Sequence, residues 1–123
     1  MSPDEAYAPT TAPDCLFCSI VAGDVPAQVV ARNDRAVAFR DIAPQAPLHV
    51  LVVPRDHHPD VAQLAAVDPT LLADVVALAH EVAQSEAAGA FRLVFNTGAS
   101  AGQSVFHVHA HVIGGAELGW SPA

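Results

Sequence analysis

Three histidines alternate with small apolar residues near the end of the sequence, in the run His107-Val108-His109-Ala110-His111. Side chains along a β-strand point to opposite faces in turn, so a strand here would place all three imidazoles on one face. Such a row suits metal binding, because three histidines with an open position form zinc sites. It equally suits nucleophilic or acid/base catalysis by neutral imidazole. The spacing alone favours neither chemistry.

A loop of small residues directly precedes the histidine run. Residues 96–104 include two glycines, and such a loop brings backbone N–H groups close to an anion. Ser104 adds a hydroxyl three residues before His107. An anion site beside imidazoles indicates phosphorus chemistry, although an ordinary hairpin connection would have a similar composition. The loop is not a P-loop, because no Gly-Lys-Ser/Thr follows it.

The two cysteines, Cys15 and Cys18, form a second candidate cluster. A Cys-x-x-Cys pair is half of a tetrahedral zinc site, and a chain with seven histidines has further ligands to offer. A redox dithiol of the thioredoxin kind would follow a strand inside a βαβ unit, whereas this pair follows a proline-rich segment. Metal binding is therefore favoured over redox use, with cysteines that merely pack as a third possibility.

Short strands and one long helix must position these groups. Apolar residues recur at helical spacing over residues 70–88, after Asp68-Pro69 and before Gly89, and predict the long helix. A short helix is expected over residues 15–21, capped by Asp14. Strands are predicted at residues 27–31, 35–40, 48–53, 91–95 and 105–113, the first two forming a hairpin. The fold class is therefore α+β: a five-stranded antiparallel sheet covered on one face.

The length and composition predict one domain with a real core. The chain has 123 residues, of which 52% are hydrophobic. We expect a flexible N-terminal tail at residues 1–13 and a single domain at residues 14–123. The net charge of −8 excludes non-specific nucleic-acid binding, which needs a basic patch. No apolar run is long enough to span a membrane and no export signal is recognisable, so no membrane partner and a cytoplasmic location are expected.

Several blocks together resemble the histidine triad (HIT) nucleotide-binding family. The histidine run resembles that family's signature, and residues 102–106, Gly-Gln-Ser-Val-Phe, resemble its usual lead-in. Residues 41–47 with His49 and residues 53–57 are similar to a second signature block, and Phe17 with residues 20–26 to the opening. The likeness covers about residues 15–120, and Gly114-Gly115 with Trp120 resemble the Hint branch.

The resemblance implies a HIT-like fold and a nucleotidyl hydrolase or transferase. Such an enzyme acts at the α-phosphate of a purine nucleoside 5′-phosphoramidate or related AMP derivative, through a covalent nucleotidyl-histidine. His109 would be the nucleophile and His111 would contact the phosphate. Ser104 would hydrogen-bond the leaving group or a phosphate oxygen, and His49 would close a proton relay. The implied nucleotide-binding residues are Asp41, Ile42, Phe17, Ile20, Val25, Phe39, Asn96, Gly102, Gln103 and Val105.

The resemblance also implies how the cysteines are used. In family members with this pair, the remaining ligands of a structural zinc ion match His57 and His107, which leaves His109 and His111 for catalysis. No organic cofactor is implied, and the family habit is a homodimer. Three alternatives stay open: a dinucleoside polyphosphate hydrolase, a nucleotide-binding regulator with negligible turnover, and a catalytic metal centre.

Overall fold

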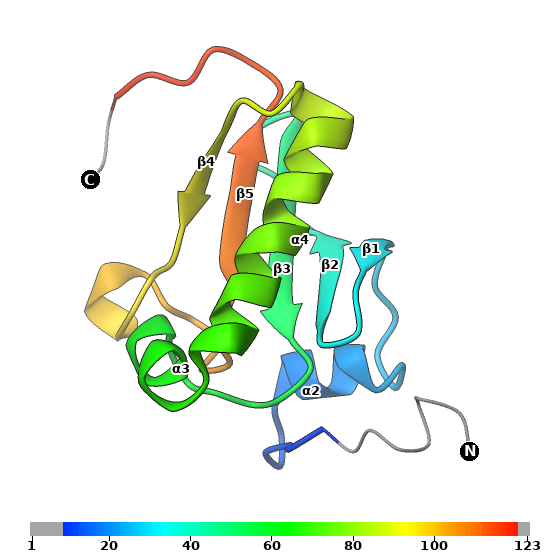
Figure 1. Cartoon of the computed structure of the whole chain (residues 1–123), viewed down its shortest axis with the longest axis vertical. Helices are drawn as coiled ribbons and strands as arrows, with labels where there is room; N and C mark the ends of the chain where they lie inside the picture. The colour runs from blue at the N-terminus through cyan, green and yellow to red at the C-terminus, as the bar shows by residue number, and fades with distance from the viewer. Residues whose placement is uncertain (1–8, 121–123) are drawn as a thin grey trace.

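Five antiparallel strands form one sheet in the computed structural model, which describes residues 9–120. The strands are β1 (Val29–Arg32), β2 (Ala36–Arg40), β3 (Leu48–Pro54), β4 (Phe91–Val94) and β5 (Ala110–Gly114). Their order across the sheet is β1-β2-β3-β5-β4, so β5 lies between β3 and β4 (Figure 1). The predicted five-stranded antiparallel α+β fold is confirmed.

The long helix α4 (Pro69–Ala87) covers one face of the sheet, the face nearest the viewer in Figure 1. Asp68 caps it, because its Oδ1 accepts a hydrogen bond from the backbone N–H of Leu71 at 3.0 Å. The helix buries an apolar stripe that includes Val75 and Leu78 against alternate residues of β2, β3 and β5. Full burial of each such side chain stabilises the fold by about 1.5–3 kcal/mol. The predicted long helix is confirmed.

The short helix α2 (Leu16–Val21) packs on the opposite face of the sheet. Its Phe17 joins an apolar cluster with Phe39 of β2 and Leu51 of β3. Both faces of the central strand β3 are therefore covered, and every one of its residues is buried. The expected cap was wrong: Cys15 caps α2, with its Sγ accepting from the Cys18 N–H at 3.4 Å, while Asp14 has a left-handed φ of +59°.

A third helix, α3 (Val61–Val67), was not predicted. Asp60 caps it by accepting the backbone N–H of Gln63 at 2.9 Å, and the Gln63 side chain returns to the same carboxylate. Its buried Leu64 packs against Leu71 of α4 and against Val108. The Asp60-x-x-Gln63 spacing, which is typical of a helix N-terminus, was the sequence signal that could have predicted α3.

The last strand begins later than predicted. β5 starts at Ala110 rather than at residue 105, so His107 and His109 precede the strand. The reason is a competing partner: the backbone N–H of Val108 donates to the carbonyl of His58 at 2.7 Å, in the loop before α3. This segment is therefore held by a loop rather than by a neighbouring strand.

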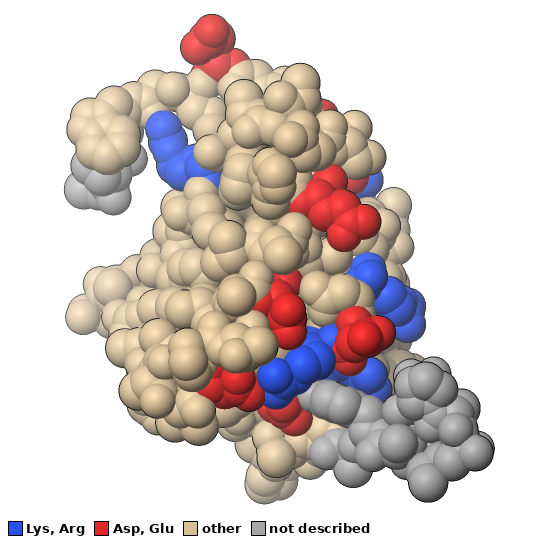
Figure 2. All heavy atoms as spheres, viewed as in Figure 1, with Lys and Arg blue, Asp and Glu red and all other residues tan. Residues whose placement is uncertain are grey.

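Two arginines near α4 form ion pairs with acidic side chains. Arg35 contacts both Asp56 and Asp68, with Nη2–Oδ2 distances of 3.3 and 2.7 Å, and Arg40 pairs with Glu86 at 2.7 Å. Figure 2 shows acidic and basic side chains side by side on the α4 side of the molecule, with much of the remaining surface uncharged. None of the helices found within residues 9–120 is long and apolar enough to cross a membrane.

Residues 1–8 of the predicted tail lie outside the described residues. In its described part, the Thr10 N–H donates to Asp56 Oδ1 at 2.9 Å and the Thr10 carbonyl accepts the N–H of His57 at 2.8 Å. These two bonds hold the segment before α2 against the loop that follows β3.

Candidate functional site

The three histidines of the run lie on the face of the sheet opposite α4. The Phe17 ring of α2 contacts the rings of His107 and His109, with centroids 6.0 and 5.0 Å apart. The rings of His109 and His111 are 5.1 Å apart. The intervening residues Val108, Ala110 and Val112 are buried on the other side. The predicted alternation therefore holds, although only His111 belongs to β5.

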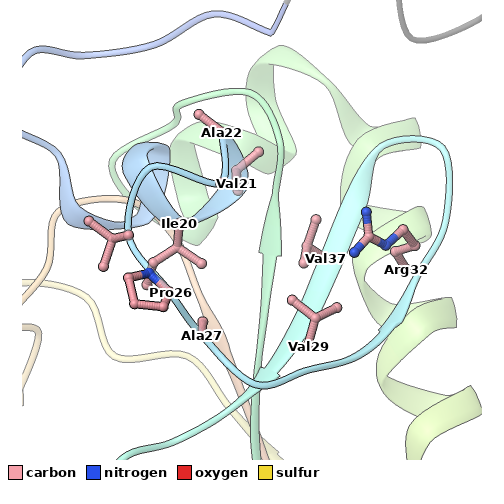
Figure 3. Close-up of a pocket in the computed structure, with 10 residues that line it drawn as sticks. Ile20, Val21, Ala22, Pro26, Ala27, Val29, Arg32 and Val37 are labelled. Carbon is pink, nitrogen blue, oxygen red and sulfur yellow. The ribbon is translucent and has the colours of Figure 1, made fainter.

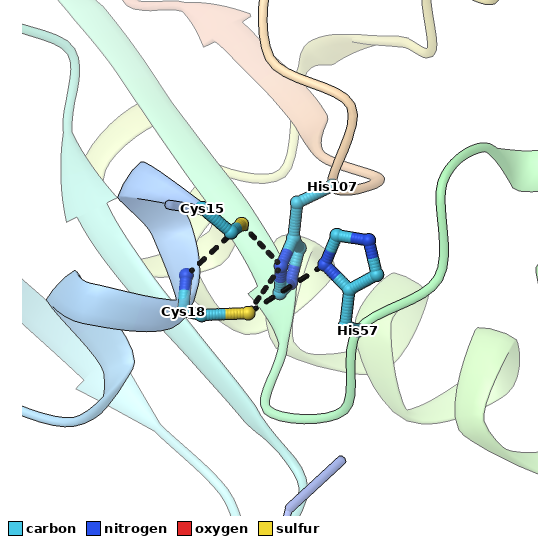
Figure 4. Close-up of side chains that lie close together, drawn as sticks. All are labelled: Cys15, Cys18, His57 and His107. Carbon is cyan, nitrogen blue, oxygen red and sulfur yellow. Dashed lines mark hydrogen bonds between the residues drawn. The ribbon is translucent and has the colours of Figure 1, made fainter. Parts of the chain in front are cut away.

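Cys15, Cys18, His57 and His107 converge at the N-terminal end of α2 (Figure 4). Their ligand atoms all lie within 4.8 Å of one another. Cys18 Sγ is 3.5 Å from Nδ1 of both His57 and His107, and Cys15 Sγ is 3.5 Å from His107 Nδ1. Donor atoms around a tetrahedral zinc ion are about 3.3–3.8 Å apart. The donor set and its spacing therefore fit a structural zinc site.

The backbone aims the His107 ring at the thiols. Its Nε2 lies 2.8 Å from the carbonyl oxygen of Pro54, which can only accept, so Nε2 carries the hydrogen and Nδ1 carries the lone pair. Metal-ligating histidines usually have such an outer partner. Burial lowers the pKa of His107 to about 4, so the ring is neutral near pH 7. Burial likewise lowers the pKa of His57.

The neighbouring ring of His109 is fixed in the other tautomer. Its Nδ1 lies 2.9 Å from the carbonyl oxygen of His107, so Nδ1 carries the hydrogen and Nε2 carries the lone pair. Burial lowers the pKa of His109, with the hydrogen bond to His107 and the charge of Asp41 opposing that shift. A neutral imidazole with a directed lone pair can act as a nucleophile.

His111, His49 and Asp41 lie close together beside His109. The backbone N–H of Gln45 donates to His49 Nδ1 at 3.0 Å, so the hydrogen of neutral His49 is on Nε2. That Nε2 lies 3.0 Å from His111 Nδ1 and 3.5 Å from Asp41 Oδ2. His111 therefore carries its own hydrogen on Nε2. Burial, followed by repulsion from the charged forms of His109 and His49, lowers the pKa of His111 to about 4.

Gln103 shapes the loop before the histidines. It is buried, and its Nε2 donates to the carbonyls of Pro59 at 2.7 Å and Val105 at 3.1 Å. Its Oε1 accepts the N–H of Gly98 at 2.9 Å. Each polar atom of this amide thus has a protein partner, and the side chain ties the loop to the segment before α3.

The other polar loop residues are placed differently. Gly102 has a φ of +94°, which favours glycine, and Asn96 Nδ2 donates to the Ala101 carbonyl at 3.0 Å across the same turn. Ser104 is exposed and lines a hollow of about 460 Å³ with Cys15 and His57. Within residues 9–120, no hydrogen bond joins the Ser104 hydroxyl to the histidine run. The structure therefore places Ser104 beside the Cys/His cluster.

The predicted apolar slot is only partly assembled. Phe17 and Phe39 are buried with ring centroids 5.5 Å apart, and Ile20 and Val105 pack against the same cluster. Ile42 instead has a fully exposed side chain. A hollow of about 410 Å³ opens next to this cluster, lined by Ile20, Val25, Val29, Arg32 and Val37 among others (Figure 3).

Sequence reasoning missed the backbone groups that orient the rings. The carbonyls of Pro54 and His107 and the N–H of Gln45 select the tautomers of His107, His109 and His49. No residue type signals such a partner. The hydrogen bonds by which the Gln103 side chain holds the loop in place were also missed, although a glutamine beside a glycine turn was a usable signal.

Comparisons with known proteins agree with this geometry. Residues 22–118 match the family model described as the HIT domain. An uncharacterized HIT-like protein of Synechocystis sp. is 41% identical over 90% of this chain and 98% of its own length. The crystal structure of a HIT family hydrolase from Legionella pneumophila has a TM-score of 0.84 and 41% identity, covering 89% of this chain and all of that one.

A zinc-bound histidine triad family protein from Mycobacterium smegmatis has a TM-score of 0.70 and 31% identity, covering 82% of this chain and 74% of that one. With the family model matching most of the chain and the fold shared with solved members, this chain belongs to the histidine triad family.

Proposed function

We propose that this chain is a nucleoside phosphoramidase or nucleotidyl hydrolase that acts through a covalent intermediate on His109. The observation that carries the proposal is the pairing of two fixed tautomers. His109 offers a lone pair on Nε2, while its neighbour His111 offers an N–H on Nε2. The Legionella relative is named a HIT family hydrolase, which supports hydrolysis in general.

The reaction has two displacements at the same phosphorus. His109 Nε2 attacks the α-phosphorus, the bond from phosphorus to the leaving nitrogen breaks, and the amine departs with the electron pair and takes up a proton. Water then attacks phosphorus, and the bond to His109 breaks to release the nucleoside monophosphate. The buried ring starts neutral because burial lowers the pKa of His109.

The neighbouring residues stabilise charge on the phosphoryl oxygens. His111 donates its Nε2 hydrogen to one of them, and His49 holds His111 in that tautomer through the 3.0 Å hydrogen bond. Ser104, whose hydroxyl is exposed, turns to the leaving group or to a phosphate oxygen when substrate is bound.

The nucleoside lies on the side of the sheet opposite α4. Asp41 accepts the ribose hydroxyls through the carboxylate that now accepts the Ala43 N–H at 2.8 Å. The aromatic pair of Phe17 and Phe39 forms the floor beneath the base, with Ile20 and Ile42 at its edges. The loop residues that face the phosphate or hold its donors in place are Asn96, Gly102, Gln103 and Val105.

The Cys/His cluster holds a structural zinc ion, and no organic cofactor takes part. Zinc bound there cross-links α2, the loop after β3 and the segment before β5. The chain's own contribution is the outward hydrogen bond from His107 to Pro54, which keeps the lone pair on the thiol side. The zinc-bound Mycobacterium relative supports this assignment.

Two finer features complete the proposal. The chain belongs to the Hint branch, and it forms a homodimer through α4, whose outer face exposes Val76. Its partner molecule is a small AMP-type nucleotide rather than a nucleic acid.

The test compares two substrates on the same preparation. With adenosine 5′-phosphoramidate we expect AMP release well above buffer, and with a diadenosine polyphosphate we expect slower release. A reversed preference would assign the chain to the polyphosphate hydrolases. Tight AMP binding without turnover of either substrate would show a nucleotide-binding regulator instead.

A further inference from the structure

The two cysteines differ in access to solvent. Cys15 is half-buried and borders the hollow of about 460 Å³ that also contains Ser104, whereas the side chain of Cys18 is buried. A small oxidant in that hollow therefore meets Cys15 first. Oxidation of a thiol follows its exposure as well as its ionisation.

The local backbone fits a bond between the two sulfurs. Cys15 caps α2 and Cys18 lies in its first turn, with the Cys18 N–H directed at Cys15 Sγ at 3.4 Å. Helix geometry places Cα atoms three residues apart at about 5 Å, within the range of about 4.4–6.8 Å that disulfides require. The two sulfurs already lie within 4.8 Å of each other, so little backbone movement is needed.

We propose that Cys15 and Cys18 are a site of reversible oxidation by hydroperoxides, at which disulfide formation displaces the metal from the cluster. The Cys15 sulfur attacks one peroxide oxygen, the O–O bond breaks, and hydroxide leaves as water after taking a proton. The Cys18 sulfur then attacks the Cys15 sulfenic acid, the S–O bond breaks, and a second water leaves. Two thiols are oxidised by two electrons, and one hydrogen peroxide is reduced to two waters.

The disulfide changes what remains of the cluster. A disulfide cannot act as two thiolate ligands, and two imidazoles alone do not make a tetrahedral zinc site. His57 and His107 would lose the ion, and the loop and the segment that carry them would lose their link to α2. The His107 carbonyl accepts the hydrogen bond from His109 Nδ1, so movement of His107 after metal loss would directly affect the position of His109. The chemistry at the sulfurs goes beyond the proposed hydrolase function and holds whether or not the chain hydrolyses nucleotides.

The experiment treats the zinc-loaded chain with hydrogen peroxide and follows thiols and metal together. Free thiols are counted by alkylation and intact mass, and released zinc is measured with a chromogenic chelator. We expect loss of both thiols with a mass change of two hydrogens, release of one zinc per chain, and reversal by dithiothreitol with added zinc. Because the chain has only two cysteines, a monomeric product with no free thiol identifies the bond.

Two variants test the order of events. Cys18→Ser should stop at a Cys15 sulfenic acid that a dimedone probe captures, and Cys15→Ser should react roughly tenfold more slowly than Cys18→Ser. Disulfides between chains, equal reactivity of the two variants, or thiols that stay free at peroxide levels that oxidise a small-molecule dithiol would each overturn the proposal. None of these readouts uses nucleotide turnover, so failure of the proposed hydrolase would be seen separately.

Discussion

Two clusters on the side of the sheet that faces away from α4 contain histidines held in different tautomers. In the Cys/His cluster, His107 gives its Nε2 hydrogen to the Pro54 carbonyl and turns Nδ1 to two sulfurs. Two residues later, His109 gives its Nδ1 hydrogen to a carbonyl and keeps its lone pair on Nε2, beside another imidazole. In the proposed function, one side-chain type would therefore serve a metal in one cluster and phosphorus in the other. In each ring, the nitrogen that donates its hydrogen to a backbone carbonyl leaves the other nitrogen with a free lone pair.

The proposed division of roles between the two clusters is tested most strongly by removing one histidine ring from each cluster in turn. For His109→Ala we expect the hydrolysis rate of adenosine 5′-phosphoramidate to fall by roughly 10⁴-fold or more, because the nucleophile is gone. Zinc content and AMP affinity should stay unchanged. The matched control is His80→Ala, which removes an exposed histidine of α4 and should keep full activity. Activity that survives His109→Ala would mean that the two clusters do not divide the work as proposed.

Removing a ligand of the other cluster should affect stability first. We expect His57→Ala to lose the zinc and to lower the free energy of unfolding by about 4 kcal/mol when free zinc exceeds its Kd about a thousandfold. Thermal unfolding with metal analysis measures both. His58→Ala is the neighbouring control and should keep the ion, since its ring is not part of the cluster. Equal zinc content in both variants would refute the ligand assignment.

In the proposed mechanism, His49 acts on His111, the neighbour of the nucleophile, rather than on phosphorus. In His49→Phe the ring of His111 loses its 3.0 Å partner, so its tautomer is no longer fixed. We expect kcat to fall by roughly 10- to 100-fold with little change in KM, because the lost donor matters most in the transition state. His49→Gln, which keeps a donor, should recover part of that loss. An unchanged kcat in both variants would show that His49 takes no part in the proposed proton relay.

Measuring the hydrolysis rate and the zinc content at the same pH values should separate the titration of His109 from loss of the metal. Burial lowers the pKa of His109 below its ordinary value of 6.5, so more than half of these rings are neutral at pH 6.5. Single-turnover rates should reach half their pH 8 value only below pH 6.5, and should then approach a tenfold fall per pH unit once most rings are protonated. Zinc content measured at each pH shows whether metal loss contributes. A rate that already halves between pH 8 and 7 would contradict a neutral, buried nucleophile.

Local patterns in the sequence predicted the large elements and the row of three histidines, whereas the histidine partners of the two cysteines came from the resemblance to the HIT family. Helical spacing at Leu71, Val75 and Leu78 and the alternation of the histidine run are local patterns that survive folding. What the sequence missed around the histidines depends on main-chain partners, which lie far away in the chain for His107 and Val108 but only two and four residues away for His109 and His49. The start of β5 is set by the His58 carbonyl, and the tautomers are set by main-chain groups that every residue carries.

The assignment of individual roles is tested most directly by trapping the intermediate. The chain is mixed with adenosine 5′-phosphoramidate, quenched within a single turnover, digested under alkaline conditions and analysed by peptide mass spectrometry. We expect an adenylyl group on His109 alone, absent in His109→Ala and present in His57→Ala. An adduct on His107, His111 or Ser104, or turnover that proceeds with no adduct in a rapid quench, would contradict it.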